Sequence, residues 1–113
     1  MAGVSELTIG GKRGSKVYVR HAERMDENFN IDMSNIDYHY RPIDDSDPFQ
    51  TDIFILSGLK EETFRPLFNY KGFQYVEVKS SEPIYLTMNS LKAYVMCSDV
   101  PAVGMISSSN PLL

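Results

Sequence analysis

The sequence predicts an all-β fold, an antiparallel β-sandwich with little helix. Several short segments alternate apolar and polar side chains with a period of two, as half-buried strands do. Glycine and proline separate these segments at short intervals, which is typical of sandwiches. No window of about eleven residues keeps apolar side chains three and four positions apart, the spacing of an amphipathic helix.

The clearest strand is SKVYVRHAE, residues 15–23, in which Val17, Val19 and His21 share one face. Residues 52–58, DIFILSG, are apolar on both faces, so we expect a strand that is covered on both sides. Pro66 cannot donate to a strand ladder, which predicts a bulge or an edge position for the segment around it. Further strands are expected at residues 4–9, 63–70, 73–78, 91–97 and 103–107.

Three short connections are predicted between these strands. GGKRGSK, residues 10–16, is interpreted as a hairpin turn, because a phosphate-binding loop needs a different glycine spacing and a helix after it. Residues 59–62 are a charged hairpin loop. Lys71 and Gly72 are predicted to form the next hairpin turn, with the glycine at positive φ.

Residues 24–50 form an acidic segment that is longer than an ordinary connection. Such segments are usually functional or wrapping loops. One short strand is expected inside it, at residues 36–41. Residues 44–52 offer carboxylates to calcium, but they lack the glycine and the final glutamate of the twelve-residue calcium loop, so a solvated acidic loop is the favoured interpretation.

The core is expected to draw on apolar side chains at alternating strand positions. We expect Cys97 to be a small buried hydrophobe and His21 to be a hydrogen-bonded core histidine. The remaining predicted core residues are Val17, Phe54, Leu56, Phe68, Phe73, Tyr75, Val76 and Val95.

Composition restricts the function. A chain of 113 residues holds one domain, and its net charge of −4 argues against a nucleic-acid or anionic-membrane partner. No apolar run approaches the ~20 residues of a membrane helix. Cys97 has no cysteine to pair with, and with only His21 and His39 beside it no zinc spacing appears, so no cofactor or metal is expected. The compartment is left open.

No catalytic group stands out. Glycoside hydrolysis needs two carboxyl groups across a sugar, whereas Glu61 and Glu62 are adjacent on a turn and Glu23 and Glu77 lie on different strands. A Ser-His-acid triad is equally unsupported.

The best sugar-binding candidate is the group Tyr38, His39, Tyr40 and Arg41, which combines stacking rings with charged donors. Ordinary cross-strand packing of these residues is the alternative interpretation. The absence of Trp weakens the carbohydrate case, because large flat rings dominate sugar-stacking platforms.

FNYKGFQYVEV, residues 68–78, resembles the F-T-Y-H-G-F-R-Y-V-E-V signature of bacterial α-L-rhamnosidases, in the concanavalin-like β-sandwich domain that precedes their catalytic domain. The opening residues 1–26 are similar to the N-M-A-G-W…G-x-x-G-x-x-V…R-x-A-E of this family. TDIFILSG resembles its T-D-x-Y-I-L-x-G, and SSSNPLL its S-N-P-L-L. The chain departs from the signature at Val4 (Trp in the family), Lys71 (His) and Gln74 (Arg, on a strand that looks buried).

The resemblance implies a jelly-roll or concanavalin-like sandwich over residues 1–113, excised from a larger multidomain glycosidase, with residues 109–113 beginning the linker to the catalytic domain. Asn110 and Pro111 suit the start of a linker helix, and we expect the last residues to pack extended against the sandwich or another copy. Cutting at this point is expected to leave a sticky face and weak self-association.

Members of the family hydrolyse terminal α-L-rhamnose by inversion, with acid and base glutamates on an α/α barrel beyond Leu113, and no residue here matches them. The implied role is a non-catalytic accessory domain whose partner is that barrel in the same parent chain, and the fragment alone is expected to be inactive. The alternative is a carbohydrate-binding module for rhamnosides.

Overall fold

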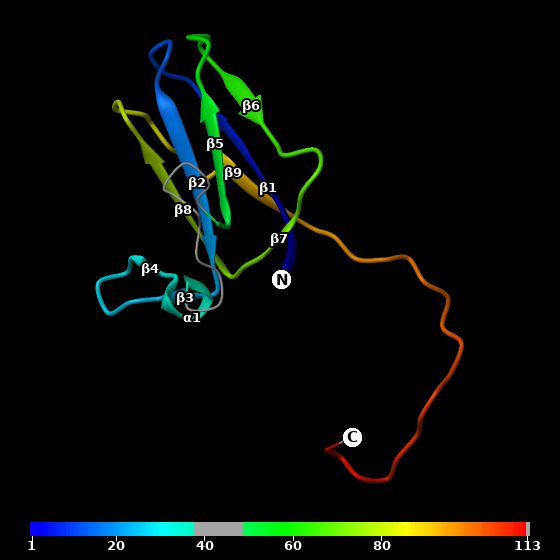
Figure 1. Cartoon of the computed structure of the whole chain (residues 1–113). Helices are drawn as coiled ribbons and strands as arrows, with labels where there is room; N and C mark the ends of the chain where they lie inside the picture. The colour runs from blue at the N-terminus through cyan, green and yellow to red at the C-terminus, as the bar shows by residue number, and fades with distance from the viewer. Residues whose placement is uncertain (38–48, 113) are drawn as a thin grey trace.

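The computed structural model describes residues 1–37 and 49–112, and these form two antiparallel sheets packed face to face (Figure 1). One short helix and a small hairpin lie at one end. The elements are β1 (Ala2–Ile9), β2 (Lys16–Ala22), β3 (Arg24–Met25), β4 (Ile31–Asp32), α1 (Ser34–Asp37), β5 (Thr51–Ile55), β6 (Glu62–Phe64), β7 (Lys71–Gly72), β8 (Tyr75–Ser80) and β9 (Leu91–Val95). The predicted all-β sandwich with little helix is confirmed.

The first sheet is built around β1. Gly3 pairs with both Val95 of β9 and Lys71 of β7, and Leu7 pairs with both Leu91 of β9 and Phe64 of β6. A strand has only two edges, so β9 occupies one edge of β1 while β6 and β7 share the other. Residues 65–70 therefore leave this edge and return to it. The strand expected at 63–70 ends at Phe64, and Pro66 lies on the connection rather than at a bulge or an edge position of a strand.

The second sheet has the order β5-β2-β8, with β2 in the centre. The register places Tyr18 between Ile53 and Lys79, and Arg20 between Thr51 and Glu77. A separate hairpin, β3–β4, continues from the end of β2 and leads into α1 (Figure 1).

Apolar side chains from both sheets meet between the layers. Leu7 and Ile9 of β1 pack against Val17 and Val19 of β2 and against Leu56, and all five are at most 3% exposed. The ring of Phe54 stacks on Phe64 of the other sheet at 4.4 Å between centroids. The burial of these apolar side chains between the two sheets is the main source of the stability of the sandwich.

The segment GGKRGSK is not a hairpin turn, because β1 and β2 lie in different sheets. It arches from one layer to the other. Gly14 adopts a φ of 87°, its amide donates to the Leu56 carbonyl at 2.9 Å, and the Leu56 amide donates to Ser15 at 3.0 Å. The arch is thus fixed on the end of β5.

Three other local predictions were wrong. Residues 59–62 do not close a hairpin, because β5 and β6 lie in different sheets. Lys71 and Gly72 form β7 rather than a turn, and the positive-φ glycines among the described residues are Gly14 and Gly58. The segment DIFILSG is covered on one face only, because Ile53 and Ile55 are 43% and 61% exposed. Nothing in the described chain covers the outer face of the second sheet.

The predicted core is partly correct. Val17, Leu56 and Phe73 are buried, and Phe54 and Val76 pack against the core. Four predicted core residues are exposed. Phe68 lies on the connection between β6 and β7, Val95 ends an edge strand, Tyr75 lies on the outer side of β8, and Cys97 follows β9 into the tail.

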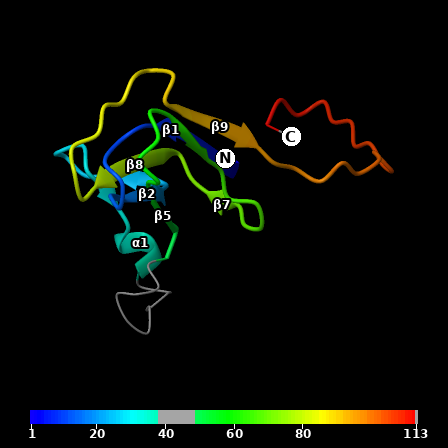
Figure 2. The ribbon, with the colours of Figure 1, turned by 90° about the horizontal axis from the view of Figure 1, so that it is seen from above.

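Residues 96–112 extend away from the sandwich (Figures 1 and 2). Residues 103–107 do not form the expected strand, and Val103, Met105 and Ile106 are more than 90% exposed, so this tail does not pack on the sandwich as expected. The Asn110 side chain accepts a hydrogen bond from the Leu112 amide at 3.0 Å, as an N-cap would. In the part of the chain that the structure describes, no helix is long and apolar enough to cross a membrane.

Candidate functional site

One end of the sandwich has a polar interior. Ser5 and Lys71 come from the first sheet, and His21 and Asp52 from the second, and all four are at least 90% buried. On β1, β2 and β5 the other inward side chains are apolar, including Leu7, Val19 and Phe54. The interior is therefore divided into an apolar half and a polar half.

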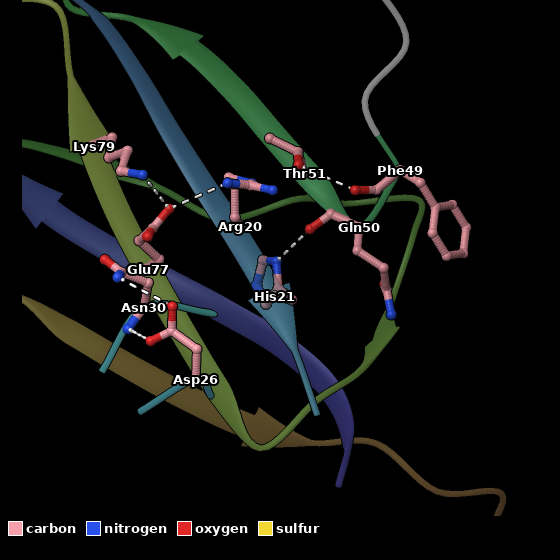
Figure 3. Close-up of polar contacts among 9 residues, drawn as sticks. All are labelled: Arg20, His21, Asp26, Asn30, Phe49, Gln50, Thr51, Glu77 and Lys79. Carbon is pink, nitrogen blue, oxygen red and sulfur yellow. Dashed lines mark hydrogen bonds and ion pairs between the residues drawn. The ribbon is translucent and has the colours of Figure 1, made fainter. Parts of the chain in front are cut away.

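His21 was predicted to be a hydrogen-bonded core histidine, and this is confirmed. Its Nδ1 lies 3.1 Å from the Gln50 carbonyl (Figure 3), its Nε2 lies 2.8 Å from Ser5 Oγ, and its ring meets the Phe73 ring edge-on at 4.9 Å. Burial is the main cause that lowers the His21 pKa, and the nearby Lys71 charge acts in the same direction, against a raising effect from the Gln50 hydrogen bond and Asp52.

The lowered pKa fixes the hydrogen-bond directions. A neutral imidazole has one donor and one acceptor, and a carbonyl only accepts. Nδ1 of His21 therefore donates to Gln50, and Nε2 accepts from the Ser5 hydroxyl. This is the geometry of a serine nucleophile beside its base, but both side chains are at most 3% exposed and a carbonyl stands where a triad has a carboxylate. The pair holds the two sheets together and has no access to substrate.

Gln50 organises this end and was missed by the sequence analysis. Its φ of 56° lies in the left-handed region, which is strained for a residue other than glycine. The strain directs its carbonyl to both the amide and the ring of His21, while its side-chain amide donates to the Gly72 carbonyl at 3.0 Å. One residue thereby connects β2 with β7 of the opposite sheet.

A buried ion pair crosses the layers beside His21. Lys71 Nζ lies 2.7 Å from Asp52 Oδ1 and 3.1 Å from the Asn69 side-chain oxygen. The second Asp52 oxygen is buried without a hydrogen-bond partner among the described residues. A buried pair of this kind positions two layers rather than adding much net stability.

The outer face of the second sheet carries a different, solvated network. Glu77 accepts from Arg20 of the adjacent strand β2 at 3.5 Å and from Lys79 of its own strand β8 at 3.0 Å (Figure 3). At the nearby β3–β4 turn, the Asp26 carboxylate accepts from the amides of Asn28 and Asn30, and the Asn30 backbone bond is the main cause that lowers the Asp26 pKa. Both arrangements are local structural contacts.

Two of the carboxylates considered for catalysis, Glu62 and Glu77, lie in different sheets and are engaged in structural contacts. Glu62 accepts from the amides of Ser57, Gly58 and Leu59 and so closes its loop, with the Ser57 backbone bond the main cause of its lowered pKa. Glu77 is held by the two cations on the second sheet. No group of three or more metal-ligating side chains is present within residues 1–37 and 49–112.

Comparisons with known proteins identify the family of the chain. Residues 1–97 match the model of the bacterial alpha-L-rhamnosidase concanavalin-like domain. The chain belongs to this family. It is 30% identical to an alpha-L-rhamnosidase of Streptomyces avermitilis over all 113 residues, and spans 10% of the length of that relative. No solved structure matches the chain.

The structure locates the departures from the rhamnosidase signature. Lys71 is the buried cation that pairs with Asp52, so it has a structural role at the polar end. Gln74 is exposed, contrary to the buried appearance of its strand, and Val4 is half-buried on the outward side of β1. These departures leave the rhamnosidase-family fold intact.

The sugar-binding candidates Tyr38, His39, Tyr40 and Arg41, which make up most of the strand expected at 36–41, lie outside the described residues, as does most of the acidic stretch 44–52. Ile36 itself lies in α1 rather than in a strand. Sugar binding by these four residues stays a prediction. Titration of the chain with rhamnose while following tyrosine fluorescence would test it.

Proposed function

We propose that this chain is a non-catalytic accessory β-sandwich domain of an α-L-rhamnosidase, and that it supports the catalytic domain and its substrate cleft. The observation that carries this proposal is the combination of a family match over residues 1–97 with a 10% share of a relative named alpha-L-rhamnosidase. A domain that is so small a part of a glycosidase leaves ample chain for a separate catalytic domain.

The engaged carboxylates support the non-catalytic role. An inverting glycosidase needs two carboxyl groups about 6.5–9.5 Å apart that both face a bound sugar. Glu62 is bound by three loop amides and Glu77 by two cations, and their strands lie in different sheets. Neither is placed to donate a proton to a glycosidic oxygen or to activate water.

In this proposal, residues 1–113 comprise one sandwich domain, residues 109–113 begin the linker, and the partner is an α/α-barrel catalytic domain of the same parent chain. The parent hydrolyses terminal α-L-rhamnose from glycosides or polysaccharides. The Asn110 cap on the Leu112 amide is consistent with a helix that begins there.

The experiment is a deletion in the product of the complete reading frame that encodes this chain. Removing residues 1–97 should lower the melting temperature of the glycosidase and reduce its activity, because the catalytic domain loses the surface on which it rests. A reading frame without a glycosidase domain, or a deletion that leaves stability and activity unchanged, would contradict the proposal.

A further inference from the structure

An open groove lies on the outer face of the first sheet. It has a volume of about 460 Å³, and its lining includes Val4, Arg65, Phe68, Tyr70, Tyr94 and Met96. The register pairs Val4 with Tyr94 on adjacent strands, and the connection between β6 and β7 supplies the opposite wall. We call it the first-sheet groove.

The walls of the first-sheet groove are apolar and exposed. Leu67, Phe68 and Tyr70 are 77%, 98% and 67% exposed, and Met96 is 50% exposed. Aromatic residues, methionine and arginine are the residue types enriched in protein interfaces. Isolated exposed hydrophobic residues are ordinary, but a hollow lined by several of them marks an interaction site.

The charged group of the groove and several of its polar atoms are already engaged. The Arg65 guanidinium lies 3.6 Å from Glu6 and 5.6 Å from the Tyr94 ring centroid, and the Asn69 side-chain oxygen accepts from Lys71. A sugar or another small polar ligand needs convergent polar groups that are available to orient it. The groove therefore suits an uncharged, largely apolar protein surface better than a glycan.

The groove also lies where the chain leaves the domain. A second hollow of about 290 Å³ adjoins it, sharing Tyr70 and Met96 and reaching Cys97 and Ser98. The family match ends at residue 97, and the alignment with the Streptomyces relative continues through the tail. The tail then carries Val103, Met105 and Ile106 into solvent (Figure 2). The groove thus adjoins the point at which the chain leaves the sandwich, and the tail beyond it carries further exposed apolar side chains.

We propose that the first-sheet groove is the face on which this domain docks onto the following part of its parent chain, whose contacting surface is uncharged and apolar. This inference rests on the proposed function and specifies which face of the accessory domain makes the contact. The outer face of the second sheet also exposes Ile53 and Ile55, but it carries the Arg20, Glu77 and Lys79 network and is therefore the weaker candidate. Charged residues of this kind are depleted at interface centres.

Hydroxyl-radical footprinting of the full-length protein tests this assignment, with each rate corrected for the intrinsic reactivity of its residue type. Phe29 is the matched internal control for Phe68, because the two are 83% and 98% exposed here and Phe29 lies outside the groove. Docking should make Phe68 several-fold less reactive than Phe29. Met96 should be less reactive than Met88 by clearly more than their exposures of 50% and 97% already give. Equal reactivity within the Phe68–Phe29 pair would overturn the assignment.

A pair of variants provides a second test of the docking face. Phe68→Asp should raise the reactivity of Tyr70 and Met96 in the full-length protein, whereas Phe29→Asp should leave both unchanged. Protection that disappears on dilution would identify a second copy as the occupant and would contradict docking within one chain. An active rhamnosidase with a reactive Phe68 refutes only the docking face, whereas a reading frame without a glycosidase refutes the proposed function and this inference together.

Discussion

Phe73 is the apolar residue that closes the polar end of the interior. It is 2% exposed, and its ring packs against His21. Replacing a buried Phe by Ala typically costs about 3–5 kcal/mol, which is a large part of the stability of a small domain. Phe73→Ala should therefore unfold the domain or nearly do so.

Chemical denaturation of the isolated chain measures this effect. Phe68→Ala is the matched control, because its ring is 98% exposed and should change the free energy of unfolding very little. Similar midpoints for the Phe73 variant and the wild type would show that this ring is not part of the core.

His21 gives the stability of the domain a pH dependence. Its pKa is lowered in the folded state mainly by burial, so between the folded and unfolded pKa values the unfolded chain binds more protons. The stability that neutral His21 contributes is fully present at pH values above the pKa of the unfolded chain, about 6.5. It is lost as the pH falls from that pKa toward the lower pKa of the folded state.

Urea unfolding at a series of pH values from neutral to mildly acidic checks the sign. In the wild type the free energy of unfolding should decrease as the pH is lowered. The decrease should be the same in His39→Gln, which removes the other histidine of the chain, and smaller in His21→Gln. An unchanged pH dependence in His21→Gln would contradict the assignment.

At the scale of elements, the Asp52–Lys71 pair connects β5 of one sheet with β7 of the other. Removing one partner leaves a buried charge alone, which costs about 3–5 kcal/mol, whereas removing both partners costs less than the sum of the two single changes. Asp52→Ala and Lys71→Ala should each destabilise strongly and should be clearly non-additive.

A double-mutant cycle by chemical denaturation measures this coupling. Glu77 and Lys79 form the matched control pair, because they lie 3.0 Å apart on one strand at the surface, where coupling is typically about 0–1 kcal/mol. Coupling between Asp52 and Lys71 no larger than that of the control would show that the buried pair does not hold the sheets together.

Strand positions were predictable from the sequence, and strand partners were not. Alternation located β1, β2 and β8 because one face of each packs on the core, and it also located β9, of which only Leu91 packs against the core. The same glycines in residues 10–14 allow either a hairpin or an arch between sheets, and only the packing of Leu56 against both layers decides. Phe68 was placed in the core because it is apolar, although its segment pairs with no strand.

The polar end was partly predictable. His21 followed from its inward position on β2. Asp52 and Lys71 also occupy inward positions, but the sequence does not reveal that β5 and β7 bring them within 2.7 Å. Gln50 gave no signal, because a left-handed backbone at a residue other than glycine depends on tertiary contacts.

At the scale of the whole molecule, the structure is a sandwich with an uncovered groove and an apolar tail, and its principal-axis extents are 59 × 31 × 28 Å. Uncovered apolar surface of this kind is expected to make the isolated chain self-associate weakly. Sedimentation velocity across a wide concentration range checks this, and a strictly monomeric profile throughout would contradict it.

The most direct test of the account is the hydrolysis of a chromogenic α-L-rhamnoside by the purified 113-residue chain. The account predicts no turnover above a mock purification, and turnover by the product of the complete reading frame under the same conditions. The reasons are that the Ser5–His21 pair is buried and that Glu62 and Glu77 are engaged in structural contacts. Turnover by the chain alone would contradict the account, because it would place catalytic groups within the sandwich.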